Sequence, residues 1–556
     1  MSYFLTKYKK DVFFLSLLSF IVAIFAIIFF QKQGLLMVDC GREPYLAKEV
    51  MMGKILYKEL LNIYGPLSYQ INAILFKLFG VHLNTLFVAG NIIAYGIILS
   101  IYFISRLFTQ EFLSFSLAFF TAVMGIANVY LFNFVFPYTF AMTYALLAIL
   151  LSLFCLLKHY QTSKRHFIVL SFFFMGFSIT SKLDFAGCLI VLLVYSLFIK
   201  KCTLKGHFYN ALAFLSLPLL AFGTLFLQGL SLQDIPIMYD LYTKIITSEG
   251  SQTFLKSILG IYSPINWTTI LNLAITNLIL LLFLCILYKI SLKTHSKVIL
   301  GVLLLIMQIS INAVVSPYSF IYIVILIFSL LLLLVAKNII KLTPINDTDL
   351  SLILLFSFSI LMSIRNFSLI VLHIAYGLYP LPILLLCLVV FIAIYAPAYI
   401  HLKNKNIFIN SLAILVIIIS NKFLIHNFVL ANFVKNSKIS TSMGSIYVTK
   451  KEFDKYQNML VSCSKIPKGN KLLVLPQGVM INFLLDKESD PFYFVLIPPY
   501  IEAFGEDKII NDLKNNPKTS FLITGIPTLG YGKIDLCVDH GQKLCKYIQS
   551  RNANKH

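Results

Sequence analysis

Charged residues are scarce in this 556-residue sequence. They make up 12% of the chain while hydrophobic residues make up 59%, and a soluble globular chain carries about 25% charged residues. The charges that are present lie between long apolar runs, and about 20 apolar residues in a row are what a helix needs to cross a bilayer. The sequence therefore predicts an integral membrane protein rather than a soluble one.

Other common patterns are also missing. The nine cysteines form no CxxC pair and show no metal-ligand spacing, and no GxGxxG sequence follows a predicted strand, which excludes a dinucleotide fingerprint. Cys463, Cys537 and Cys545 lie in the polar C-terminal region. Two of them could form a disulfide if that region is outside the cytoplasm, but three cysteines do not specify a pair.

The net charge of +22 does not indicate a nucleic-acid-binding protein. Most of the lysines lie in short loops beside apolar spans, which is typical of membrane orientation signals. No basic helix with interleaved aromatic residues stands apart from a span. We therefore expect the positive charge to anchor cytoplasmic loops, and we expect no nucleic-acid partner.

The apolar runs predict about 13 transmembrane helices, counted by bilayer length. The first run is too long for a typical signal peptide and is followed by no small-residue cleavage site, so we expect it to be retained as a span. The expected spans are roughly 11–30, 85–105, 112–130, 138–157, 166–180, 185–199, 207–228, 268–288, 298–314, 318–336, 350–372, 380–400 and 407–427.

Loop charges predict the orientation of these spans. If the N-terminus is cytoplasmic, every loop that falls inside carries Lys or Arg, as the positive-inside rule requires. The short opposite loops near Pro137 and Pro317 carry neither. Three long segments then face outward, namely 31–84, about 229–266, and about 429 to the end.

The third outward segment differs sharply in composition from the rest, being rich in Lys, Asp, Asn, Gly and Pro. Alternating helical and strand-like stretches predict a small α/β domain there. We therefore expect an all-α polytopic membrane domain over 1–428 and an extracytoplasmic α/β domain over 429–556. The expected elements are helices near 450–461 and 501–513, strands at 471–476 and 520–524, and a final helix from Gly541.

The first outer loop, residues 31–84, is the most informative stretch. Asp39, Arg42 and Glu43 follow directly on the first span, and residues 46–52 and 66–79 are amphipathic. Such helices can lie in the plane of the membrane interface, where they would hold Asp39 near the membrane surface. The alternative is that these carboxylates are merely solvated, because functionally perturbed groups are a minority.

The loop also carries motifs in a recognisable order. They are Asp39-Cys-Gly-Arg-Glu-Pro-Tyr45, Gly53-Lys-Ile-Leu-Tyr57-Lys-Glu59, Tyr64-Gly-Pro66 and Leu78-Phe-Gly80. This order resembles the first loop of the GT-C glycosyltransferases, and more narrowly that of bacterial relatives of protein O-mannosyltransferases and lipid A aminoarabinose transferases. The resemblance covers most of the chain by architecture but only short stretches by residue.

The resemblance implies a sugar transferase. Such enzymes take a sugar from a polyprenyl-phosphate carrier at the outer face of the bacterial inner (plasma) membrane, and an acidic residue just after the first span is catalytic. Asp39 matches that residue by position and would act as general base on the acceptor hydroxyl. The lipid phosphate that leaves needs cations or hydrogen-bond donors. The sugar stays open, as does the choice among lipid, polysaccharide and protein acceptors.

Further candidates lie along the chain. Lys182 and Asp184 lie between two apolar runs, where charges are costly unless they pair or line a cavity; a plain interfacial turn is the alternative. Arg365 lies within a span and is expected to face a cavity or an ion pair, and Tyr376 follows in an outer turn like that of the family. With Asp39 as the catalytic residue, the residues expected to bind donor phosphate or substrate are Arg42, Glu43, Tyr64, Lys182, Asp184, Arg365 and Tyr376.

Some residues have a more ordinary interpretation. Tyr138 and Tyr318 each start a span and are expected to be interfacial belt residues, with sugar or lipid contact as the alternative. No His-rich or paired-carboxylate spacing supports a metal site that includes Asp234 or Asp240, so no metal ligand is assigned, and dependence on a divalent cation is left open.

Two other functions compete with sugar transfer. A transporter or flippase of lipid-linked saccharide predicts internal repeats and charges at the membrane midplane. The sequence shows no such repeat, and its candidate charges gather at the predicted outer face instead. A non-catalytic assembly protein of the cell envelope is the third possibility, and composition alone does not exclude it.

Overall fold

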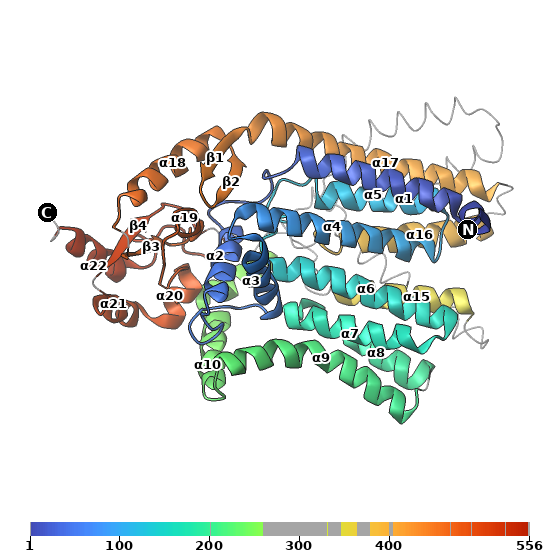
Figure 1. The fold of residues 1–556 in the computed structure, drawn as a ribbon, viewed down its shortest axis with the longest axis horizontal. Helices are drawn as coiled ribbons and strands as arrows, with labels where there is room; N and C mark the ends of the chain where they lie inside the picture. Colours follow the sequence, from blue (N-terminus) through green and yellow to red (C-terminus); the bar gives the residue numbers. More distant parts are fainter. Residues whose placement is uncertain are drawn as a thin grey trace.

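The computed structural model consists mainly of helices (Figure 1). A bundle of long apolar helices occupies one part of the molecule, and a mixed helix-and-strand segment lies beyond one end of the bundle. The structure describes residues 2–259, 331, 346–363, 378–399 and 404–553, apart from the single residues 201, 468, 491, 517 and 529.

Apolar helices form the bundle. Within the described residues, five helices are long and apolar enough to cross a membrane, so the chain is an integral membrane protein. The expected spans at 268–288, 298–314 and 318–336 lie outside the described residues, so the number of about 13 stays a prediction. The bundle helices are α1 (Ser2–Ile28), α4 (Leu83–Arg106), α5 (Glu111–Gly125), α6 (Phe140–Thr162), α7 (Arg165–Ser181), α8 (Cys188–Val194), α9 (Leu204–Gln228), α15 (Asp347–Met362), α16 (Leu381–Tyr399) and α17 (Lys405–Val429).

Small polar residues let neighbouring bundle helices approach closely. Ser152 of α6 donates to the carbonyl oxygen of Ser171 of α7 at 2.8 Å, and Ser171 donates to the carbonyl oxygen of Ser152 at the same distance. Farther along the same pair, the Ser178 hydroxyl donates to the carbonyl oxygen of Ala145 at 3.1 Å. Small side chains and interhelical hydrogen bonds are the usual means by which membrane helices pack.

One end of the bundle carries Arg106 and Lys164. Helix α4 ends at Arg106, which forms ion pairs with Asp11 at 2.7 Å and Glu111 at 3.1 Å. Helix α6 starts and α7 finishes beside the first loop. The turn that joins them, which contains Lys164, therefore lies at the other end of the bundle, where α4 finishes. We call the end with Arg106 and Lys164 the basic end, and the opposite one the loop end.

Two helices shape the first loop at the loop end. They are α2 (Arg42–Met51) and α3 (Leu67–Phe79). Helix α3 has a buried and an exposed face, whereas α2 is buried on most sides, including Leu46, Ala47 and Val50. Helices thus form over both predicted stretches, but α2 lacks the exposed face that is expected of an amphipathic helix. The second long segment holds two further helices, α10 (Asp234–Thr247) and α11 (Glu249–Leu259).

The C-terminal segment mixes strands and helices, as its composition predicts. Strands β1 (Ser437–Thr441) and β2 (Gly444–Val448) form an antiparallel hairpin, and β3 (Lys471–Leu475) pairs in parallel with β4 (Thr519–Ile523). Neither the hairpin nor helix α19 was predicted from the sequence. The helices are α18 (Lys450–Ser464), α19 (Met480–Leu484), α20 (Pro498–Phe504), α21 (Glu506–Lys514) and α22 (Gln542–Ala553).

The prediction of a single helix over 501–513 is wrong, because two helices, α20 and α21, cover this stretch. Gly505 separates α20 from α21 because its backbone adopts φ +80°, a left-handed conformation that glycine tolerates and a continuous helix does not. The polypeptide thus turns at Gly505 and starts a new helix at Glu506.

The C-terminal segment packs against the first loop. The Lys435 amine donates to the carbonyl oxygens of Lys32 (3.2 Å), Gly34 (2.8 Å) and Val129 (2.8 Å). Helix α19 also contacts α2. Whether 1–428 and 429–556 are separate domains stays a prediction, and the described contacts join the two parts.

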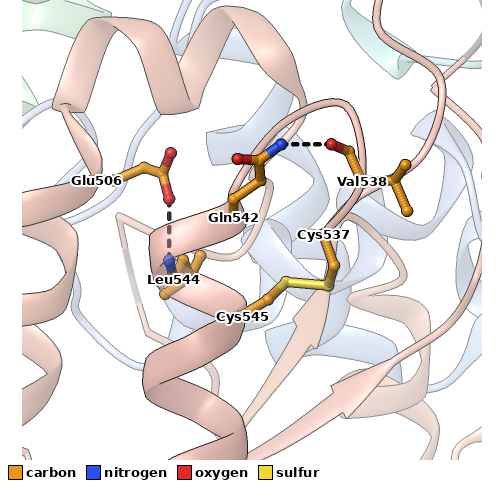
Figure 2. Close-up of a disulfide and its surroundings, with 6 residues drawn as sticks. All are labelled: Glu506, Cys537, Val538, Gln542, Leu544 and Cys545. Atoms are coloured by element: carbon orange, nitrogen blue, oxygen red, sulfur yellow. Dashed lines mark hydrogen bonds between the residues drawn. A yellow bond between two sulfur atoms is a disulfide. The ribbon is translucent and has the colours of Figure 1, made fainter.

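A disulfide closes the last loop of the chain. Cys537 and Cys545 are bonded, which joins the loop before α22 to the first turns of that helix (Figure 2). The third candidate, Cys463, is a free and buried thiol on α18. The structure thus selects one of the pairs that the sequence left open.

Candidate functional site

Asp39 and Arg42 form an ion pair at the start of the first loop's helices. A short 3-10 turn over Asp39–Gly41 runs directly into α2, and the three-residue spacing places the two side chains on one face. The Asp39 side chain is 27% exposed and that of Arg42 is 14% exposed. Burial alone lowers the pKa of Arg42, but the Asp39 carboxylate outweighs burial and holds it above its usual value.

Tyrosines surround Arg42. Tyr64 and Tyr69 of the first loop and Tyr500 of α20 line one small cavity together with Arg42. The Arg42 guanidinium interacts with the Tyr500 hydroxyl. Tyr500 is not among the predicted site residues, because nothing in the order of residues indicates that α20 reaches the first loop.

Lys182 contacts the ring of Tyr64. Its side chain is only 3% exposed, and Nζ lies 4.2 Å from the centre of the Tyr64 ring and 5.3 Å from that of Tyr138. Nζ is also 3.6 Å from a carboxylate oxygen of Asp184. A cation over aromatic faces gains electrostatic attraction, more so where water is excluded.

Tyr138 is not the interfacial belt residue that the sequence predicts. It is 1% exposed, whereas a belt residue would point its ring into the membrane interface. Its ring packs instead against those of Phe132, Tyr64 and Tyr379. The belt interpretation is therefore wrong for Tyr138. Tyr318 lies outside the described residues.

A tight turn brings Tyr64 to Lys182. The Asn62 amide donates to the carbonyl oxygen of Tyr64 at 2.7 Å and accepts from its N–H at 3.2 Å, which fixes the turn. Gly65 then donates to the carbonyl oxygen of Ser181 at 3.1 Å. A Cβ on Gly65 would lie 1.9 Å from the carbonyl oxygen of Thr180, so only glycine fits this approach.

Glu43 follows Arg42 in α2 and is buried. Its side chain accepts from the Tyr69 hydroxyl at 3.0 Å and from the Phe140 N–H at 2.9 Å, and the residue is 1% exposed. Burial raises the pKa of Glu43, although these hydrogen bonds oppose the rise. Glu43 therefore connects α2, α3 and the start of α6, away from the open surface.

The remaining candidates are placed as follows. Arg365 and Tyr376 lie outside the described residues. Asp234 accepts from Ser231, and Asp240 pairs with Lys244 at 2.6 Å. Across the part of the chain that the structure describes, no group of three or more His, Cys, Asp or Glu side chains is arranged to hold a metal ion. Dependence on a divalent cation stays untested.

The structure thus brings together most of the described candidates. Asp39 contacts Arg42, Arg42 and Tyr64 line one cavity, and Tyr64 contacts Lys182, which in turn contacts Asp184. These residues come from the first loop and from the turn after α7. Acidic, basic and phenolic side chains thus contact one another in succession at the loop end of the bundle.

Comparison with known proteins returns a distant structural likeness. No family model matches the chain, and no curated protein matches it. Among solved structures, the crystal structure of ArnT from Cupriavidus metallidurans bound to undecaprenyl phosphate is similar over 85% of each chain, with 12% identity and a TM-score of 0.42. ArnT is a lipid A aminoarabinose transferase of the GT-C type, a group that the first-loop motifs resemble. A likeness at this level carries no argument about activity.

Proposed function

We propose that the protein is a membrane glycosyltransferase that moves a sugar from a polyprenyl-phosphate donor to an acceptor, with Asp39 as general base. The observation that carries the proposal is the arrangement of charges at the loop end. A partly exposed carboxylate, Asp39, is oriented by Arg42, and a second cation, Lys182, lies beyond Tyr64. The order of the first-loop motifs supports the same function.

The transfer follows from this arrangement. An acceptor hydroxyl gives its proton to Asp39 as its oxygen forms a bond to the anomeric carbon of the donor sugar. The bond between that carbon and the phosphate oxygen breaks, and polyprenyl phosphate leaves with the electron pair. Attack opposite the leaving group inverts the anomeric centre.

Cations stabilise the leaving phosphate. Arg42 and Lys182 are proposed for this role, because developing negative charge is best stabilised by donors that are already in place. Arg365 and Tyr376 are proposed to add further contacts to the donor, and Asp184 to hold Lys182. Glu43 is proposed to position α2, since both of its carboxylate oxygens are engaged inside the protein.

The reaction is proposed to take place at the outer face of a bacterial plasma membrane. Arg106 and Lys164 lie at the end of the bundle opposite the first loop, and short loops that carry basic residues face the cytoplasm. The Cys537–Cys545 disulfide independently favours an oxidising compartment for the C-terminal segment. The N-terminus is then cytoplasmic, and residues 429–556 form the outer part.

A transfer assay tests the proposal. The full-length protein in lipid nanodiscs is incubated with a panel of polyprenyl-phosphate sugars and with lipid, polysaccharide and peptide acceptors. Asp39→Asn is expected to lower the transfer rate by about 100- to 10,000-fold, the usual contribution of a general base, without changing membrane insertion. Asp454→Asn is the matched control, because Asp454 is an exposed carboxylate in an ion pair on α18. Wild-type transfer by Asp39→Asn would contradict the catalytic assignment.

A further inference from the structure

Helix α10 exposes an apolar face. Ile235, Tyr239 and Ile246 are 44%, 74% and 58% exposed. Spacings of four and seven residues place these three side chains on one side of the helix. Water is an unfavourable environment for large apolar side chains, so the face is expected to contact an apolar partner. We call these three residues the apolar face of α10.

The rest of α10 divides into a buried side and a polar side. Ile245 is buried, and the helix packs against α20 of the C-terminal segment. Asp240 and Lys244 form an exposed ion pair at 2.6 Å on the polar side. Ile237 is exposed near the polar side, but single apolar residues are common on protein surfaces. A helix with an apolar and a charged exposed side is typical of helices that lie in the plane of a membrane interface.

Helix α10 also has the position and direction of such a helix. Helix α9 ends at Gln228, and α10 begins at Asp234. Lys58 of the first loop donates to the carbonyl oxygen of Gly229 at 2.7 Å and pairs with Asp234 at 3.5 Å, so α10 starts at the loop end of the bundle. There it runs across the direction of the bundle helices (Figure 1). Since the bundle helices cross the membrane, a helix at right angles to them lies along its surface.

The apolar exposure of α10 continues that of α9. Helix α9 has the composition of a membrane span, and most of its side chains are not buried in the protein. Apolar side chains on its exposed side are expected to contact lipid acyl chains. Leu227 in its last turn is 90% exposed, and Leu232 in the turn before α10 is 75% exposed. The lipid-facing surface of α9 therefore leads directly to α10.

We propose that α10 docks on the lipid bilayer at the loop end, with its apolar face inserted between the headgroups and the acyl chains. Tyr239 suits this depth, because an aromatic ring with a polar tip is favoured at the boundary between lipid and water. The Asp240–Lys244 pair stays in water. Through Lys58, the same contact ties the first loop to the membrane surface. The contact goes beyond the transfer reaction, because it needs neither Asp39 nor a sugar donor.

Fluorescence quenching of the full-length protein in lipid nanodiscs tests the proposal. The chain contains one tryptophan, Trp267. Trp267→Phe removes it, and a new tryptophan is introduced in this background by Ile235→Trp, Tyr239→Trp or Lys244→Trp. Lipids with bromine on the acyl chains near the headgroup are expected to quench Ile235→Trp and Tyr239→Trp, and the emission of both should shift to shorter wavelength. Iodide in the water should quench neither.

Lys244→Trp is the matched control, because Lys244 is exposed on the polar side of the same helix. It is expected to be quenched by iodide and not by the brominated lipid. All three new tryptophans replace exposed side chains, and such substitutions usually change stability little. If Trp267→Phe fails to fold, Trp267→Tyr provides the background instead.

Two outcomes would overturn the proposal. If iodide quenches Ile235→Trp and Tyr239→Trp as strongly as Lys244→Trp, the apolar face of α10 lies in water. If neither iodide nor the brominated lipid quenches them, another protein surface, such as a second copy of the chain, covers this face.

Discussion

The Nζ atom of Lys182 lies 4.2 Å from the centre of the Tyr64 ring, so the turn after α7 and the first loop share one buried contact. Lys182 is 3% exposed and Tyr64 lines the same cavity as Arg42. Tyr64 thus contacts Lys182 and also lines the cavity that contains Arg42. The proposed binding of the donor phosphate depends on it.

Lys182→Met is expected to raise the KM for the polyprenyl-phosphate sugar by about 10- to 100-fold, because a hydrogen bond to a charged group contributes roughly 1.5–3 kcal/mol. Lys182→Arg keeps the charge and should be less impaired. Initial rates against donor concentration measure both, and Lys450→Met on the exposed face of α18 is the control. An unchanged KM in Lys182→Met would remove Lys182 from donor binding.

Gly65→Ala is expected to disrupt the turn that carries Tyr64, because the new Cβ would lie 1.9 Å from the carbonyl oxygen of Thr180. Overpacking of this kind costs about 1–3 kcal/mol, so both the melting temperature in detergent and the transfer rate should fall. Gly223→Ala is the matched control, since no atom lies within 4 Å of the added Cβ on α9. Equal stability of the two variants would show that the turn shifts to accommodate the added Cβ without loss of stability.

Glu43→Gln is expected to change how stability depends on pH. Burial raises the pKa of Glu43, so the folded protein holds the proton at pH values where the unfolded chain has lost it. The wild type therefore loses stability as the pH rises from about 4.3, the usual value for Glu, through the raised folded value. Glutamine does not titrate, so the stability of Glu43→Gln lacks this dependence on pH.

The melting temperature of both proteins between about pH 4 and 7 measures this effect. The wild type should lose stability relative to Glu43→Gln across the range, while Glu452→Gln in the capping box of α18 serves as the control. Parallel curves for wild type and Glu43→Gln would mean that Glu43 is not the group that titrates.

Reporter fusions test the orientation. A fusion in the exposed turn at Lys164, between α6 and α7, is expected to be cytoplasmic, and one after His556 is expected to be outside. Lys164 lies at the basic end, and basic loops face the cytoplasm. The disulfide lies in the C-terminal segment, and disulfides persist outside the cytoplasm. If both reporters were found on the same side, the assignment of the outer face would be wrong.

Local patterns predicted much of the fold and part of the site. Length and hydropathy located the bundle helices, because a bilayer imposes both on a spanning segment. The ion pair of Asp39 with Arg42 was not predicted, although residues three apart meet on one helical face. Apolar periodicity likewise predicted helices in the first loop, but the burial of α2 on most sides depends on tertiary packing.

Contacts between distant segments were not predictable. Tyr500 reaches Arg42 through the packing of α20, and no local pattern encodes that approach. Tyr138 starts a span and so looks like a belt residue, yet tertiary packing buries it beside Lys182. The β1–β2 hairpin was missed because two five-residue strands give a weak periodic signal.

Arg42 and Tyr500 also set a constraint on synthesis. The cavity between them is built from parts of the polypeptide that lie more than 400 residues apart. A ribosome must therefore synthesise the polypeptide through residue 500 before the cavity can close around Arg42. Any product of premature termination before residue 500 carries Asp39 and Arg42 into the membrane without that cover, so incomplete chains are unable to assemble the full site.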